Sequence, residues 1–161
     1  MTSLPVTIRA ARPADFEALV ELDWSSAVHH ARLEPDFYRV PERTAIADFL
    51  RRRLADPDRE VLVAEADGAV VGMVDVTLDE EPDPGSIVRP VPTADIGISV
   101  LEDWRGRGVG HALMAAAEAS ATARGARRIM LDMSAANVGA LRFYRSLGYG
   151  EYGLLLRREL G

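Results

Sequence analysis

Apolar residues in the first half of the chain follow two spacings, one typical of strands and the other of helices. Val6 to Ala10 is a short β-type run, and the apolar positions from Phe16 to Leu22 then recur at helical spacing. Further along, two β-branched runs flank Asp67-Gly68, which is a strong signal for a two-residue hairpin turn. We therefore predict a strand, a helix and an antiparallel strand pair at Val61–Ala66 and Val70–Leu78.

The segments between these elements have weaker patterns. Trp24 to Val40 shows no clear periodicity, and we expect an irregular segment there. A second helix is predicted from about Glu42 to Leu54, where Asp56-Pro57-Asp58 ends it. Asp79 to Pro92 holds four acidic residues and four prolines, which do not continue a β-ladder, so we expect a mobile loop.

The second half alternates between strand and helix patterns. In order, it predicts a strand at Asp95–Val100, an alanine-rich helix at Val109–Arg124 closed by Gly125, a strand at Arg128–Met133, a helix at Val138–Ser146 and final strands within Tyr149–Leu160. No repeat and no long linker divides the chain. We therefore predict one α/β domain over residues 1–161, with a central sheet flanked by helices.

Composition excludes several classes of protein. The chain has no cysteine, which removes disulfide frameworks, Cys-based zinc sites and thiol nucleophiles and suits a reducing compartment, so we expect a cytoplasmic protein. All 19 basic residues are arginine, which excludes Schiff-base chemistry. The net charge of −6 argues against nucleic acid as a partner. No apolar window is long enough for a membrane span, and the first ten residues lack a signal-peptide pattern.

A glycine-rich turn stands where a predicted strand gives way to the alanine-rich helix. Arg105, Gly106, Arg107, Gly108 and Gly110 leave backbone N–H groups uncovered beside a helix start, an arrangement that binds phosphate groups. The alternative is an ordinary turn with solvated arginines. A phosphate-loop lysine is excluded because the chain has none, and His111 occupies the position where a dinucleotide fingerprint requires glycine.

These residues resemble the phosphate signature of the GNAT family of acetyl-CoA-dependent N-acetyltransferases. Arg105, Gly108 and Gly110 match its spacing. The family's later motif follows in order as Asn137, Ala140, Phe143-Tyr144 and Leu147-Gly148-Tyr149. The resemblance covers Ala94 to Tyr149 closely and the N-terminal half loosely. One departure is Glu102, where relatives often have proline; we expect it to change the rigidity of the turn and not the ligand.

The resemblance implies a fold and a binding mode for acetyl-CoA. It implies a mixed, mostly antiparallel sheet in which Asp95–Val100 and Arg128–Met133 splay apart and form the acetyl-CoA cleft. The residues expected to bind this co-substrate are Ile98, Ser99 and Val100, whose backbone would pair with pantetheine, and Gly106, Arg107, Gly108, Val109, Gly110 and His111, which with Arg105 would hold the pyrophosphate. Asn137 has two compatible roles, as a helix N-cap and as a pantetheine contact. No metal is implied, and a homodimer is consistent with relatives that often pair.

The resemblance also suggests catalytic residues. Tyr144 stands at the family's acid position and would protonate the departing thiolate; its alternative is a core aromatic beside Phe143. Asp132 and Asp95 are candidate bases, or else solvated carboxylates at strand ends. Direct removal of the ammonium proton by an ordinary carboxylate is unfavourable by about 8 kcal/mol. A water relay, or attack by the fraction of the amine that is already neutral, is therefore favoured. The Val100 N–H would polarise the acetyl carbonyl.

Two functional hypotheses follow. The first is an N-acetyltransferase that moves an acetyl group from acetyl-CoA to a primary amine of a small molecule or peptide by direct attack in a ternary complex, which agrees with the missing cysteine. The alternative is a catalytically silent acyl-CoA-binding regulatory domain. We favour surface roles for His29 and His30, and solvation over acceptor steering for the acidic run that begins at Asp79.

Overall fold

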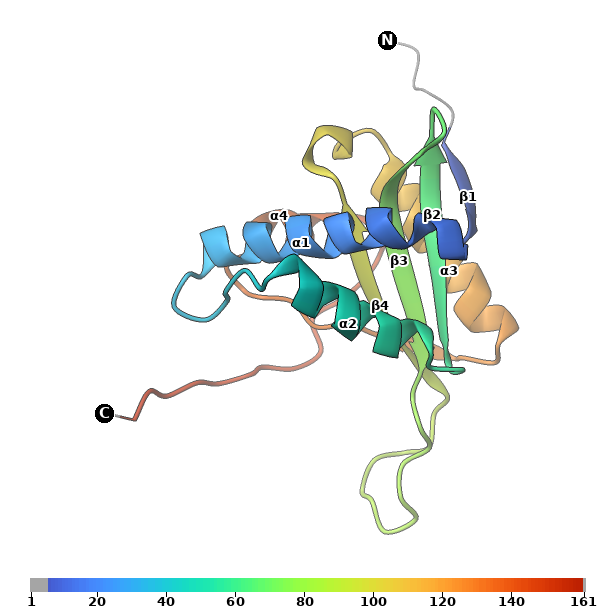
Figure 1. Ribbon diagram of the computed structural model, residues 1–161. Coiled ribbons are helices and arrows are strands. Elements are labelled where there is room, and N and C mark those ends of the chain that lie inside the picture. Colours follow the sequence, from blue (N-terminus) through green and yellow to red (C-terminus); the bar gives the residue numbers. More distant parts are fainter. Residues whose placement is uncertain (1–5, 161) are drawn as a thin grey trace.

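A five-stranded sheet forms the centre of the computed structural model (Figure 1), which describes residues 6–160. The ends of the predicted domain, residues 1–5 and 161, lie outside the described residues. The strands stand side by side in chain order: β1 (Thr7–Ala10), β2 (Arg59–Ala66), β3 (Ala69–Leu78), β4 (Thr93–Val100) and β5 (Arg128–Met130). The first four pair antiparallel, and β5 pairs parallel to β4. This confirms the predicted mixed, mostly antiparallel sheet.

The β2–β3 hairpin confirms its turn signal. Asp67 and Gly68 both have positive φ, 51° and 76°, the conformation that suits the twist of a two-residue hairpin. The pairing places Met73 on one face of the sheet and Val74 on the other, because side chains alternate along a strand. Both residues are buried, so β3 lies between two apolar layers.

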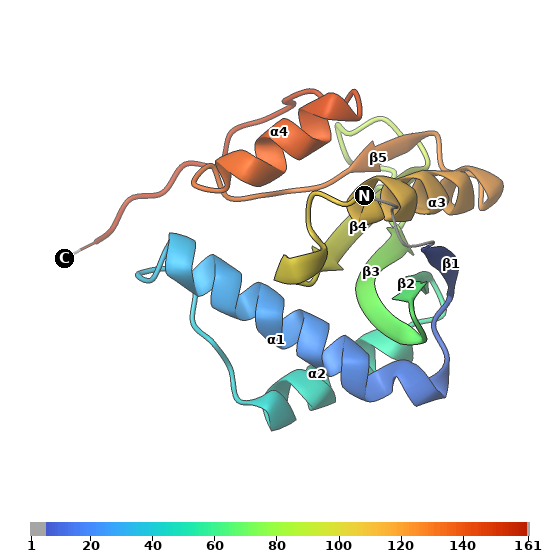
Figure 2. The same cartoon turned by 90° about the horizontal axis from the view of Figure 1, so that it is seen from above.

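Helices cover both faces of the sheet (Figure 2). Helices α1 (Phe16–Leu33) and α2 (Arg43–Leu54) lie on one face, where Leu19 and Leu22 pack with Met73. Helix α3 (Val109–Ala123) lies on the other face and buries Leu113 and Met114 against Val74. Helix α4 (Val138–Ser146) lies on the same side as α3. Within residues 6–160, no helix is both long and apolar enough to cross a membrane.

Helix α1 corrects the expectation of an irregular segment from Trp24 to Val40. The helix continues to Leu33 because the stretch from Trp24 contains neither glycine nor proline. Pro35 is the first breaker, and the residue before a proline is disfavoured in the helical region. Glu34 accordingly leaves it, with φ −140° and ψ 77°. His29 and His30 therefore lie on a regular helix instead of a loop.

The C-terminal strands are a second correction. Strand β5 ends at Met130 and not at Met133, because its pairing with β4 stops there. Residues 149–160, predicted as strands, contain no strand; they follow α4 as a chain without regular structure. The sequence pattern has strand character, but a strand is stable only beside a partner, and these residues have no sheet neighbour among those described.

Candidate active site

The gap between β4 and β5 opens at Asp95. Pairing between these strands ends at Asp95↔Met130, whereas β4 continues to Val100. The Leu101 N–H bonds to the Val71 carbonyl on the β3 side. Because backbone groups alternate along a strand, Ile98 and Val100 direct theirs toward the gap.

The backbone N–H and C=O of Ser99 face β3 and not the gap. It pairs with Met73 of β3, so its amide and carbonyl face that strand. Of the three residues expected to pair with pantetheine, only Ile98 and Val100 thus offer backbone groups to the gap. The splaying that the resemblance implied is present.

The turn between β4 and α3 forms a cradle of backbone amides. Gly106 and Gly108 have φ values of 70° and 84°, which side-chain-bearing residues rarely adopt. Gly108 is the N-cap of α3 and has no capping side chain, so the first N–H groups of α3, from Val109 to His111, have no partner within the helix. A Cβ added at Gly106 or Gly108 would meet nothing within 4 Å. Open space and free donors at a helix start fit a phosphate group.

Two arginines flank this cradle in different ways. Arg105 donates from Nε to the Val100 carbonyl at 3.1 Å, so it closes the turn onto the end of β4. Its Nη1 lies 3.5 Å from Nδ1 of His29 on α1. The Arg107 guanidinium lies over the Trp104 ring, 5.2 Å from its centre, and is exposed. Burial, followed by the Arg105 charge, lowers the pKa of His29 below the usual histidine value.

Helix α4 packs on the first turn of α3. A Cβ at Gly110 would lie 3.1 Å from the Phe143 ring, so this glycine provides room for the aromatic side chain. The His111 ring meets Phe143 edge-on, with 5.2 Å between ring centres. Gly110 therefore has a packing role that the motif spacing did not predict, and it fixes α4 next to the cradle.

The three predicted catalytic residues lie in one neighbourhood. Tyr144 is half-buried on α4, with its ring 5.3 Å from Phe143 and 5.9 Å from Tyr149. Burial, followed by the charges of Asp132 and Asp95, raises the pKa of Tyr144. Burial also raises the pKa of Asp95, and the Asp132 charge adds to the effect. Tyr144 therefore feels the charges of both carboxylates, and Asp95 lies on β4 at the point where its pairing with β5 ends.

Asn137 performs the capping role. It is the N-cap of α4, and its Oδ1 accepts a hydrogen bond from the Ala140 N–H at 3.1 Å. The side-chain amide nitrogen is not used in this bond, so a contact with pantetheine remains compatible with the cap.

A buried ionic network beside the site was missed by sequence reasoning. Asp75 on β3 is only 5% exposed and accepts hydrogen bonds from Arg53, at 2.7 Å, and from Arg59. Arg53 also bonds Asp23 of α1 at 3.2 Å. Gly97 faces Asp75 across the strands, and a Cβ there would approach the carboxylate oxygen to 2.7 Å. The available signal was a lone aspartate inside the apolar run Val70–Leu78.

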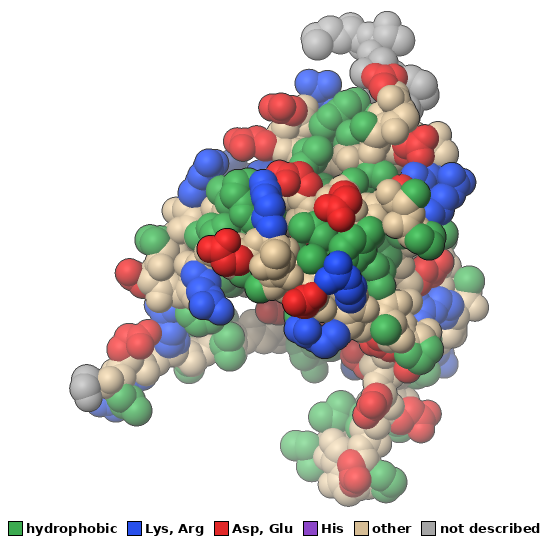
Figure 3. Space-filling view, viewed as in Figure 1, with side chains coloured by type: hydrophobic (Ala, Val, Ile, Leu, Met, Phe, Trp, Pro, Cys, Tyr) green, Lys and Arg blue, Asp and Glu red, His purple; other side chains and the backbone are tan. Residues whose placement is uncertain are grey.

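The acidic run lies apart from this network. Residues 79–92 connect β3 to β4 without regular structure, and the loop projects below the body of the molecule, where acidic side chains mark it (Figure 3). Glu80, Glu81 and Gly85 are exposed. Asp79, at the base of the loop, is near enough to contribute to the raised pKa of Asp95.

Similarity to known proteins points to one family. A model described as the acetyltransferase (GNAT) family matches residues 17–149. An aminoglycoside N(6')-acetyltransferase type 1 from Stenotrophomonas maltophilia is 34% identical over 146 residues, covering 90% of this chain and 86% of that protein. The L-amino acid N-acetyltransferase AaaT from Escherichia coli (strain K12) is 31% identical over 146 residues, covering 89% and 82%. The fold also matches the solved aminoglycoside N-acetyltransferase AAC(6')-Iy in complex with CoA, with a TM-score of 0.71 at 24% identity, covering 97% of this chain and 95% of that one.

Proposed function

The chain belongs to the acetyltransferase (GNAT) family, and on that premise we propose that it transfers an acetyl group from acetyl-CoA to a primary amine of a small molecule or peptide, by direct attack within a ternary complex. The observation that carries this proposal is the uncapped start of α3 at Gly108, which adjoins the gap where Tyr144, Asp95 and Asp132 gather. We take residues 1–161 as one catalytic domain and, from the cysteine-free composition, place the reaction in the cytoplasm.

The residues proposed to bind acetyl-CoA extend along one continuous path. Ile98 would pair with the pantetheine amides, as an added strand pairs with a sheet edge. Val100 would contribute its N–H alone, because Arg105 donates to its carbonyl. The pyrophosphate would lie on the amides of the cradle, close to Arg105 and Arg107, with Gly106, Gly108, Val109, Gly110 and His111 forming its floor. Ser99 and Asn137 border this path. A solved relative of the same fold binds CoA, which supports this assignment.

Tyr144 is the proposed general acid. Bound acetyl-CoA supplies a thioester whose thiol leaving group has a pKa of about 8.5. The phenol is protonated at neutral pH, which is the state a donor requires. Burial and nearby carboxylates raise the pKa of Tyr144, so it is a weaker acid than a free tyrosine. The Val100 N–H faces the gap and would polarise the acetyl carbonyl, while Arg105 already occupies the Val100 carbonyl.

Asp95 and Asp132 are proposed to receive the proton of the amine through water. The raised pKa of Asp95 reduces the difference between its pKa and that of an ammonium group. A water relay, or attack by the amine molecules that are already neutral, is still the favoured route. The carboxylates also make the acceptor side of the gap negative. Two relatives act, by their names, on aminoglycosides and on L-amino acids, so we propose a small-molecule amine as the first acceptor class to test, with peptides second.

The Tyr144→Phe variant separates catalysis from cofactor binding. We expect kcat for CoA release to fall about 100-fold or more with the best amine of a panel of aminoglycosides, amino acids and peptides, since a general acid contributes that much. The Kd of CoA should stay within about twofold, because the hydroxyl is not in the proposed pyrophosphate path.

Tyr149→Phe is the matched control. It removes a hydroxyl that donates to Glu118 at 2.9 Å, so it should lose about 1 kcal/mol of stability and keep its turnover. If Tyr144→Phe turned over as fast as the parent, Tyr144 would have no part in the reaction. If the parent bound CoA and acetylated no amine of the panel, the silent acyl-CoA-binding domain would replace the enzyme as the favoured function.

A further inference from the structure

The end of α1 contacts both sides of the gap between β4 and β5. On the β4 side, the Nδ1 atom of His29 lies 3.5 Å from Nη1 of Arg105. On the β5 side, the Glu34 carboxylate accepts a hydrogen bond from the Ser134 hydroxyl. Pairing between the two strands stops at Asp95, so the end of α1 brings together two segments that the sheet leaves apart.

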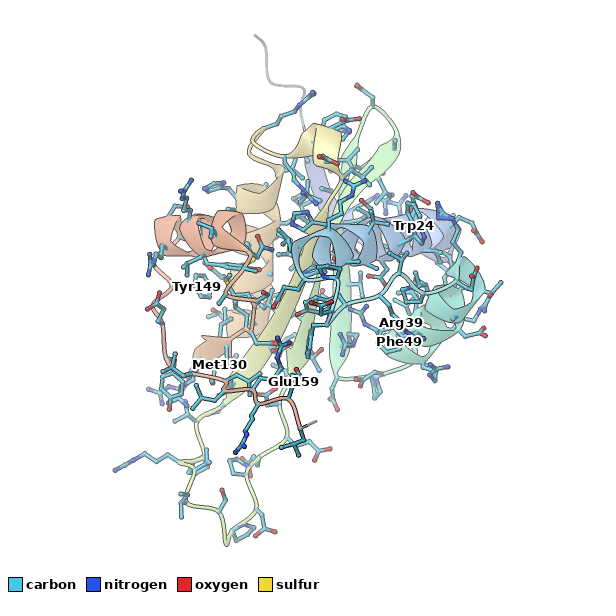
Figure 4. All side chains as sticks on the ribbon, turned by 90° about the vertical axis from the view of Figure 1, so that its left-hand side faces the viewer. Trp24, Arg39, Phe49, Met130, Tyr149 and Glu159 are labelled. Atoms are coloured by element: carbon cyan, nitrogen blue, oxygen red, sulfur yellow. The ribbon has the colours of Figure 1, made fainter. Side chains whose placement is uncertain are left out.

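Ser134 belongs to an irregular loop between β5 and α4. Strand β5 ends at Met130, which Figure 4 labels, and residues 131–137 contain neither helix nor strand. The loop carries Asp132, which is proposed to receive a proton, and leads into α4, which carries Tyr144. In Figure 2 it runs from β5 to the side of the molecule where α1 ends. The position of this loop therefore affects two proposed catalytic groups.

Ser134 organises the loop from its centre. Its Oγ accepts a hydrogen bond from the Ala136 N–H at 3.1 Å, and its carbonyl accepts one from the Asn137 N–H at 2.9 Å. The same hydroxyl donates to Glu34. Because Asn137 is the N-cap of α4, a shift of Ser134 would move the start of that helix with it.

Glu34 has a fixed backbone at the other end of this bond. It is the C-cap of α1, where its N–H donates to the His30 carbonyl at 3.0 Å. Its own carbonyl accepts hydrogen bonds from the N–H groups of Phe37 and Tyr38, at 3.1 and 2.9 Å. Glu34 and Ser134 are both half-buried, and a hydrogen bond to a carboxylate is stronger than one between neutral groups. Glu34 is therefore a well-placed anchor for the loop.

The loop has few other attachments. Apart from the bond to Glu34, and among residues 6–160, the hydrogen bonds of residues 132–137 stay within the loop or go to the first turn of α4. Helices α1 and α4 lie on opposite faces of the sheet (Figure 2). The Glu34–Ser134 bond thus ties this part of the loop to the helix layer on the other face.

We propose that Glu34 is a positioning residue for acetyl transfer: by binding Ser134, it holds Asp132 and the start of α4, and through α4 also Tyr144, in place. This inference rests on the proposed function, because the exact position of these groups matters only where a proton is transferred. Glu34 acts through Ser134 and lies outside the cradle, so its contribution should appear in turnover and not in the affinity for CoA.

Glu34→Ala and Ser134→Ala remove the bond from its two ends. With the best amine of the panel, we expect each to lower kcat about tenfold, and the double variant to lose no more than either single one, since both remove the same contact. Glu34→Gln retains an oxygen that accepts from Ser134 and should restore kcat to within about threefold of the parent. Asp36→Ala, which removes an exposed carboxylate two residues further on, is the matched control and should behave as the parent.

The affinity for CoA separates positioning from general damage to the fold. We expect the Kd of CoA to stay within about twofold of the parent in all of these variants. Losses of kcat that multiply in the double variant, or a Glu34→Gln variant as slow as Glu34→Ala, would overturn the positioning role.

Hydrogen exchange of the free, full-length chain reads the contact without any substrate. We expect the amides of residues 132–137 to exchange at least about fivefold faster in Glu34→Ala and in Ser134→Ala than in the parent, with the amides at the start of α3 unchanged. In an active parent, equal exchange in the parent and both variants would overturn the positioning role alone. A parent that acetylates no amine of the panel would overturn the proposed function, and the role of Glu34 with it.

Discussion

At the scale of single residues, the site needs glycine at several positions, and the physical requirement for glycine differs from one position to the next. Gly108 has a positive φ of 84° at the start of α3, which motif spacing and turn chemistry could predict. Gly97 has a different reason, because it leaves room for the buried Asp75 carboxylate. Gly110 makes room for Phe143. These packing reasons depend on contacts between distant segments, which a sequence pattern does not contain.

Asp95 gives the first prediction at this scale. Because burial and neighbouring carboxylates raise its pKa, the charged form of Asp95 is lost at a higher pH than for a free aspartate, whose pKa is about 3.9. If the carboxylate serves in proton removal, kcat/KM should fall as the pH drops through this raised value. Asp95→Asn should abolish that limb of the profile.

Two further variants sharpen the pH experiment. Asp132→Asn removes the neighbouring charge that raises the pKa of Asp95, so it should move the acidic limb to lower pH. Asp83→Asn changes an exposed carboxylate in the loop and should leave the profile as in the parent. Profiles identical to the parent in both Asp95→Asn and Asp132→Asn would remove the two carboxylates from the mechanism.

At the scale of elements, strong local signals predicted structure well and partner-dependent signals did not. The hairpin at Asp67-Gly68 and the cap at Asn137 appear where turn and cap chemistry put them. The predicted length of α1 was too short. Its apolar periodicity is weak beyond Leu22, but the chain contains no helix breaker there, and the helix continues to Leu33. Residues 149–160 were predicted as strands because apolar and polar residues alternate there, but a strand needs a neighbouring sheet edge, which the sequence does not locate.

Asn137 gives a prediction for an element. Asn137→Ala removes the cap of α4 and should lower the free energy of unfolding by about 1 kcal/mol. Asn137→Ser keeps a capping oxygen and loses the side-chain amide, so its stability should match the parent while its affinity for CoA falls if the amide contacts pantetheine. Thermal unfolding and calorimetry measure the two quantities. A serine variant with the affinity of the parent would leave Asn137 with the capping role alone.

At the scale of the whole molecule, a chain with net charge −6 is proposed to bind a polyanion. The net charge of the chain alone would repel such a ligand, but the groups at one place on the surface attract it. Arg105 and Arg107 flank the free amides at the start of α3, so the favourable field is confined to one end of one helix. The sequence motifs predicted this place and also Tyr144, Asp95 and Asp132 as catalytic residues, whereas the distances between these three depend on how β4 and β5 separate, which no sequence pattern contains.

The two ends of α3 offer a direct test of that claim. Gly108 precedes the helix with φ 84° and Gly125 follows it with φ 94°, and a Cβ at either position would meet nothing within 4 Å. Alanine at either site therefore incurs a similar backbone strain of about 1 kcal/mol, and Gly125→Ala is a matched control for stability.

The decisive measurement is the Kd of CoA for both variants, by calorimetry at one fixed salt concentration. We predict that Gly108→Ala weakens binding about tenfold or more, because its methyl group would crowd the phosphate oxygens proposed to bind the amides, and that Gly125→Ala binds as the parent does. Equal affinities for CoA in the parent and both variants would contradict the assignment of the pyrophosphate to the start of α3.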